Sequence, residues 1–184
     1  AIPELLQLGH IAKDKREFPL MLPFASKKAW IWHAPSDKLD AVAYSMEWVV
    51  SRSLKRLPLR AVNLQMIDGK DLGMYFHALT ELDAPMRMQD ILIDARAIGE
   101  WIEKTVKSVA QVRKSMGANK FPTVSEYNQA YPNTPIPYRL LCILNFPHGF
   151  NNSALENLEK LLENGDKIGL YSFIHVDSTA VEVH

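Results

Sequence analysis

The stretch Ala29–Leu57 predicts a β-strand, a turn and a long helix in direct succession. The apolar run Ala29–Trp32 predicts the strand, which breaks before Pro35, and Ser36 and Asp37 then provide candidates for a helix N-cap. The apolar residues that follow recur at helical spacing and form one face: Val42, Met46, Val49, Val50, Leu54 and Leu57. A strand that leads directly into a helix is typical of folds in which the two elements alternate.

The alternation continues along the rest of the chain. Further predicted strands are Arg60–Ile67, a short apolar run at Ile91–Ile93, Tyr138–Leu144 and Ile168–Val176. Further predicted helices are Asp94–Met116, which stops at Gly117, a short helix opened by the capping box Thr123–Glu126, and Ser153–Glu163. Tyr138–Leu144 is apolar on both faces, as a strand buried in a parallel sheet must be. The order β-α-β-(β)-α-α-β-α-β predicts an α/β domain with three layers around a mainly parallel central sheet.

The first 28 residues form a lead-in to this domain. We expect a short helical or irregular segment at Ile2–Leu8 and a charged loop at Lys13–Glu17. The two prolines of Phe18–Phe24 restrict that segment to a short edge strand or an extended conformation. Residues 1–184 are predicted to form a single domain. Because the chain starts at Ala1 and stops just after a strand, we expect it to be a fragment of a larger protein.

Composition limits the classes of partner. Lys and Arg total 21 and Asp and Glu also total 21, so the chain has no overall basic footprint for nucleic acid or an anionic membrane. The single cysteine, Cys142, excludes an internal disulfide and lies in an apolar run, which predicts a core position. No apolar stretch approaches the ~18 residues of a membrane span, and no signal peptide is present, so we expect a soluble cytoplasmic protein.

Several segments, in their order, resemble the motor domain of the FtsK/SpoIIIE DNA translocases, in the FtsK/HerA group of P-loop ATPases. They cover nearly the whole chain and are PLMLPFA, AWIW with its following helix, LRAVNLQMIDGKDLGMY, Ile91–Met116, EYNQAY, PYRLLCILNF and NGDKIGLYSFIHVDS. Asp68 and Lys70 are retained from an Asp-Pro-Lys turn of the family, with Gly69 in the proline position. The resemblance implies a RecA-like P-loop NTPase fold.

The departures from the family lie at its chemistry. A P-loop requires G-x-x-x-x-G-K-[ST], whose glycines allow close backbone approach to phosphate, whose lysine binds phosphate and whose hydroxyl binds Mg²⁺. In this chain the glycine positions hold Trp32 and Asp37, the lysine position holds Lys38, and the hydroxyl position holds Leu39. Only the lysine is present, and Asp37 adds a negative charge that repels phosphate.

The second motif of the family is also altered. It requires a carboxylate after the apolar strand to organise Mg²⁺ and water. Here the strand leads into Asn145 and Pro147, and the next acidic residue is Glu156. Asn145 carries no negative charge and is not a base. The combined losses predict a pseudo-ATPase.

We therefore predict no catalytic residues and only a degenerate nucleotide site, formed by Ser36, Asp37, Lys38 and Asn145. ATP and Mg²⁺ are expected as cofactors only if this site retains binding. For Lys38 an alternative is a local role, in which it caps the loop or pairs with Asp37 or Asp40.

Polar residues also gather where the predicted strands end. Ligands of parallel α/β sheets bind beyond the carboxyl ends of the strands. The residues expected near that edge are His33, Asp68, Asn145, His148, His175 and Asp177. Their types are compatible with a metal site, but their spacing matches no ligand motif, so we predict no metal.

Three functional hypotheses follow. The first is a catalytically inactive ATPase-fold domain of a DNA translocase-related protein, with a structural, regulatory or partner-docking role toward other ATPase domains of the same chain or oligomer. The alternative is an ATP-binding DNA translocase subunit with residual ATPase activity or a composite site. The third is a module that contacts DNA, alone or through a parent assembly, and the neutral composition argues against it.

Overall fold

A parallel five-stranded sheet forms the centre of the chain, with the strand order β3-β7-β6-β4-β5. The computed structural model describes residues 5–13, 16–23, 29–55, 57, 62–81, 87–117 and 120–180. The strands are β3 Ala29–Ala34, β4 Val62–Asp68, β5 Arg87–Met88, β6 Tyr138–Phe146 and β7 Leu170–Asp177. The predicted parallel sheet is confirmed.

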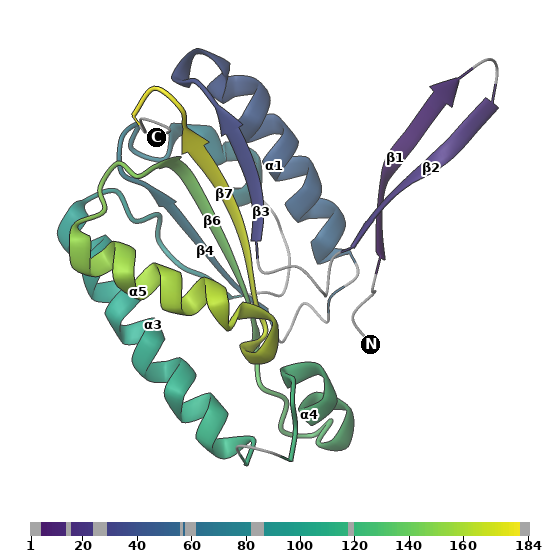
Figure 1. The fold of residues 1–184 in the computed structure, drawn as a ribbon, viewed down its shortest axis with the longest axis vertical. Coiled ribbons are helices and arrows are strands. Elements are labelled where there is room, and N and C mark those ends of the chain that lie inside the picture. Colours follow the sequence, from purple (N-terminus) through teal and green to yellow (C-terminus); the bar gives the residue numbers. More distant parts are fainter. Residues whose placement is uncertain are drawn as a thin grey trace.

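Helices cover both faces of this sheet, so the predicted three layers are confirmed as well (Figure 1). Helix α1 packs on one face, and α3 and α5 pack side by side on the other. The helices are α1 Leu39–Leu54, α2 His77–Thr80, α3 Ala95–Ser115, α4 Val124–Ala130 and α5 Asn152–Glu163, with short 3₁₀ turns η1 Ser36–Lys38, η3 Met74–Phe76 and η4 Gly165–Ile168. Within the described residues, no helix combines the length and the apolar character needed to cross a membrane.

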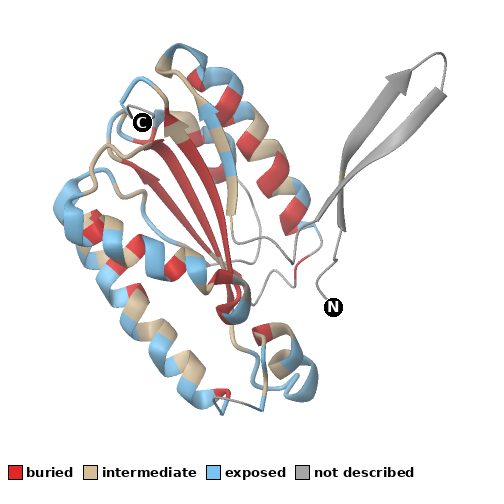
Figure 2. Cartoon of the chain, viewed as in Figure 1, coloured by how far each residue is buried: buried red, intermediate tan, exposed pale blue. Residues whose placement is uncertain are grey.

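The central strands are buried on both faces, as the apolar pattern of β6 predicts (Figure 2). Leu140 and Cys142 point into the core under α1, whereas Leu141 and Ile143 point into the core under α3 and α5. Burial raises the pKa of the Cys142 thiol far above its usual range, and the carboxylate of Glu47 adds to the effect. The prediction of a core cysteine is confirmed.

The strand register brings the carboxyl ends of the strands to one edge of the sheet. Ala34 at the end of β3 is paired with Asp177 at the end of β7, and Asp68 at the end of β4 is paired with Leu144 of β6. Polar residues at these ends are thereby placed next to one another.

The lead-in differs from the sequence-based expectation. Strands β1 (Leu5–Lys13) and β2 (Arg16–Pro23) pair as an antiparallel hairpin, in a separate two-stranded sheet. The helical or irregular prediction for Ile2–Leu8 is therefore wrong for its described part, because backbone pairing with the far end of β2 outweighs the local pattern. The extended conformation of Phe18–Phe24 is confirmed as far as Pro23. Ile2–Glu4, residues 14–15 of the charged loop, and Phe24 lie outside the described residues.

Two helix starts also differ. The helix α1 begins at Leu39 with no side-chain cap, and the Ser36 hydroxyl donates a hydrogen bond to Asp177 instead of capping. The helix α5 is capped by Asn151, whose side chain accepts from the Ala154 amide, and not by Ser153. The Thr123 cap of α4 is confirmed.

The short apolar run Ile91–Ile93 contributes less pairing than predicted. Leu92 forms one isolated parallel bridge with Ile67, whereas the strand β5 lies earlier, at Arg87–Met88. The predicted C-terminal end of α3 is confirmed, since Gly117 follows the helix with a φ of 64°.

The turns after β4 and β6 touch through their glycines, which yields a test of the packing at this edge. A Cβ at Gly69 would collide with the carbonyl oxygen of His148, so Gly69→Ala should lower the free energy of unfolding by about 1–3 kcal/mol. The control is Gly99→Ala in α3, where an added Cβ would lie 3.9 Å from the Asn151 side chain, an ordinary contact distance, and it should raise stability by about 0.5–1 kcal/mol. Urea unfolding of both variants measures the difference, and equal stabilities would contradict the close approach.

Candidate functional site

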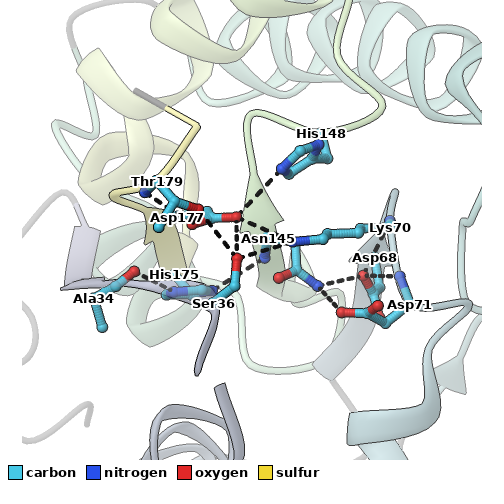
Figure 3. Close-up of polar contacts among 10 residues, drawn as sticks. All are labelled: Ala34, Ser36, Asp68, Lys70, Asp71, Asn145, His148, His175, Asp177 and Thr179. Carbon is cyan, nitrogen blue, oxygen red and sulfur yellow. Dashed lines mark hydrogen bonds and ion pairs between the residues drawn. The ribbon is translucent and has the colours of Figure 1, made fainter. Parts of the chain in front are cut away.

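A cluster of hydrogen-bonded side chains occupies the carboxyl edge of the sheet (Figure 3). We call it the edge network, and its members are Ser36, Asp68, Lys70, Asp71, Asn145, His148, His175, Asp177 and Thr179. It contains all the residues that the sequence places at this edge except His33. The His33 side chain is exposed and makes no hydrogen bond or ion pair with the described residues.

Asp177, at the end of β7, is one of the two fully buried carboxylates of the edge network. Its carboxylate is fully buried and accepts hydrogen bonds from the hydroxyl groups of Ser36 and Thr179, each at 2.6 Å, and from the Thr179 amide at 3.0 Å. Burial alone would raise the pKa of this carboxyl, but these donors and Lys70 outweigh it and hold the pKa well below its usual range.

Lys70 supplies the positive charge opposite Asp177. Its Nζ lies 3.3 Å from Asp177 Oδ2 and donates to the Ser36 hydroxyl at 2.9 Å. His148 Nε2 lies 3.3 Å from the same carboxylate oxygen. Lys70 and Asp177 are thus paired within the chain itself.

Asp68 organises the turn that carries Lys70. The carboxylate is fully buried, and its two oxygens accept from the backbone amides of Lys70, Asp71 and Gly73 at 3.0–3.3 Å. Gly73 has a φ of 78°, a conformation that glycine adopts without strain. The Asp-Gly-Lys sequence therefore forms a rigid turn that directs Lys70 across the edge.

Asn145 joins this turn to β6. Its amide nitrogen donates to Asp68 Oδ1 and Asp71 Oδ2, both at 2.9 Å. Only a side chain with two N–H donors can satisfy both carboxylates, and an acidic residue here would place a third negative charge beside them. The amide of Asn145 therefore fits this position better than a carboxylate would.

His175 connects the three strands at the other side of the edge. It is fully buried, and its Nδ1 accepts from the backbone amide of Asn145 at 3.2 Å. The ring proton therefore lies on Nε2, which donates to the Ala34 carbonyl at 3.0 Å. His175 thus has a structural hydrogen bond on each nitrogen.

The four predicted nucleotide-site residues are only partly brought together. Ser36 and Asn145 belong to the edge network, but Asp37 and Lys38 do not. Lys38 Nζ lies 3.3 Å from Asp37 Oδ2, and both side chains are about two-thirds exposed. This contact is one of those expected if Lys38 has a local role. Leu39, in the hydroxyl position, is buried in the core.

Sequence reasoning did not assign Lys70, Asp71 and Thr179 to this site. The Asp-Gly turn directly after a strand was the available signal for the first two. Within the residues that the structure describes, no group of three or more His, Cys, Asp or Glu side chains is arranged to hold a metal ion.

Similarity to known proteins is found in structure only, since no protein-family model and no curated protein matches the sequence. EssC (ATPases 2 and 3) from Geobacillus thermodenitrificans is similar with a TM-score of 0.76 at 12% identity, over 99% of this chain and 35% of that chain. EccC (ATPases 2 and 3) from Thermomonospora curvata, in complex with a signal sequence peptide, has a TM-score of 0.65 at 11% identity, over 95% of this chain and 29% of that chain. The pCW3 conjugation coupling protein TcpA, with ATPγS, has a TM-score of 0.66 at 11% identity, over 94% of this chain and 47% of that chain.

These similarities define the class of fold. The chain has the fold of RecA-like P-loop ATPase domains, as the sequence resemblance implies. It spans less than half the length of each of these three chains.

The buried carboxylate of Asp177 yields a pH-dependent prediction. Asp177→Asn should lower the free energy of unfolding at pH 7 by about 2–3 kcal/mol, because the surrounding donors lose a charged acceptor. The folded-state pKa lies below that of an unfolded aspartate, so this stabilisation is complete above about pH 4 and declines as the pH falls further. Urea unfolding at pH 7 and pH 3 should show a smaller difference between wild type and variant at pH 3.

The matched control is Asp37→Asn, which removes an exposed carboxylate in the turn before α1. Its stability should stay close to that of the wild type at both pH values. An Asp177→Asn variant as stable as this control at pH 7 would contradict the assigned role of Asp177.

Proposed function

We propose that this chain is a catalytically inactive ATPase-fold domain of a translocase-related protein, with a structural or partner-docking role. The observation that carries the proposal is the edge network, in which Lys70 neutralises the buried carboxylate of Asp177 at the end of β7, and Ser36, from the turn between β3 and α1, donates a hydrogen bond to it. At this edge a nucleotide-binding sheet offers its donors to phosphate. Here the donors bind a carboxylate of the chain.

The turn before α1 supports the same proposal. A phosphate-binding turn directs several backbone N–H groups outward. In this turn the Lys38 amide donates to the Pro35 carbonyl at 3.0 Å, and the Leu39 amide donates to the Ser36 carbonyl. We infer that Ser36, Asp37, Lys38 and Asn145 are remnants of a nucleotide site that no longer binds ATP or Mg²⁺.

Charge also disfavours nucleotide at this edge. Asp68, Asp71 and Asp177 lie in the edge network and Asp37 lies beside it, whereas Lys70 is already paired. A polyphosphate entering here would meet these carboxylates in a partly dehydrated environment, where repulsion is stronger than in water.

The proposed partners are other ATPase domains of the same chain or oligomer. The similar EssC and EccC structures each contain ATPases 2 and 3, and this chain spans about a third of each. A domain that keeps the ATPase fold but binds no nucleotide would contribute to such an assembly through surface contacts with the other ATPase domains.

Calorimetric titration with ATP and Mg²⁺ tests the proposal. The expected result is no saturable binding at micromolar to low-millimolar ATP, for the wild type and for Lys38→Ala alike. Micromolar binding by the wild type that is lost in Lys38→Ala would contradict the proposal and favour the alternative, an ATP-binding subunit with residual or composite-site activity.

A further inference from the structure

A second polar site lies at the other end of the sheet from the edge network. A pocket of about 350 Å³ opens between α3 and the first residues of β4 and β6. The residues of its lining that matter here are Asn63, Gln65, Trp101, Lys104, Ser108 and Arg139. None of them belongs to the edge network.

The strand face under α3 changes character at this pocket. Near the carboxyl edge this face carries Ile67 and Ile143, which are buried in the core under α3 and α5. Two and four residues earlier on the same face, the strands carry Gln65 and Arg139, and Asn63 is the register partner of Arg139. Polar side chains thus occupy a strand face that is apolar nearer the carboxyl edge, which is unfavourable unless these side chains find hydrogen-bond partners.

Arg139 has an incomplete set of partners. Its Nη2 donates to the Ser108 hydroxyl at 2.9 Å, but its Nη1 is buried and makes no hydrogen bond. Burial lowers the pKa of the guanidinium group. Within the described residues, no carboxylate pairs with Arg139, and the second charged group in the lining is also positive, Lys104. The pocket therefore lacks an anion.

Gln65 lacks a hydrogen-bond donor. Its side chain is 3% exposed, and its amide nitrogen donates to the carbonyl oxygens of Met66 and Asp90, both at 2.9 Å. These two acceptors fix the orientation of the amide group, so the remaining atom is Oε1. That oxygen is buried and makes no hydrogen bond.

We propose that this pocket binds a small organic anion that carries a carboxylate for Arg139 and an N–H donor for Gln65. Lys104 adds a second positive charge for the carboxylate. Trp101, held by a hydrogen bond of 2.9 Å from Nε1 to the side chain of Gln89, provides an apolar wall. Such a ligand supplies a hydrogen-bond partner to both Arg139 Nη1 and Gln65 Oε1, whereas an anion without a donor group supplies one only to Arg139.

N-acetylglycine is a probe of this chemistry, and N-acetylsarcosine is the matched probe in which a methyl group replaces the N–H. In ¹H–¹⁵N spectra of the chain, the indole N–H signal of Trp101, assigned with Trp101→Phe, should shift saturably with N-acetylglycine. N-acetylsarcosine and acetate should bind about five- to tenfold more weakly, since each carries a carboxylate for Arg139 but no donor for Gln65. This comparison uses the unaltered protein.

The variant Arg139→Gln should weaken binding of N-acetylglycine at least about tenfold, because it removes the charged donor. Arg113→Gln, on the same helix as Lys104 but outside the pocket, removes the same charge and should leave binding unchanged. The proposal is overturned if the Trp101 signal does not respond to N-acetylglycine, if N-acetylsarcosine or acetate binds as tightly, or if the two arginine variants behave alike.

Discussion

The buried carboxylate of Asp177 must be neutralised from within the protein, and much of the carboxyl edge depends on this requirement. A charge without water around it needs donors on every side. Ser36 comes from the turn after β3, Thr179 from the end of β7 and Lys70 from the turn after β4. Satisfying one carboxylate therefore ties three separate segments together and fixes the path by which the chain leaves the sheet.

In this arrangement the polar groups at the carboxyl edge of an ATPase-type fold find their partners within the chain. The turn between β3 and α1 lies at this edge. Its donors, the Ser36 hydroxyl and the Lys38 and Leu39 amides, bind groups of the chain itself. Asn145 contributes to the same network, because its amide nitrogen donates to both Asp68 and Asp71. Ser36 and Asn145 thus take part in one hydrogen-bonded network, whereas Asp37 and Lys38 lie outside it.

Much of the fold was predictable because its signals are local or periodic. The strand β6 is apolar on both faces, and α3 shows a clear amphipathic face that ends at Gly117. The grouping of Asp68, Asn145 and Asp177 at one edge followed from their positions after parallel strands. The bond from Ser36 to Asp177 joins residues 141 positions apart and depends on β3 lying beside β7, which no local pattern specifies. The hairpin of β1 and β2 was also missed, although its two strands are adjacent in the chain.

The central claim is that Asp177 stays ionised because the chain itself supplies its partners. A pH titration of the carboxyl ¹³C chemical shift of Asp177 tests it most directly. We predict no titration of this signal between pH 7 and pH 3, because the pKa lies well below that of a free aspartate. A titration with the ordinary midpoint near pH 4 would show that the carboxylate is hydrated and unpaired, and would contradict the account.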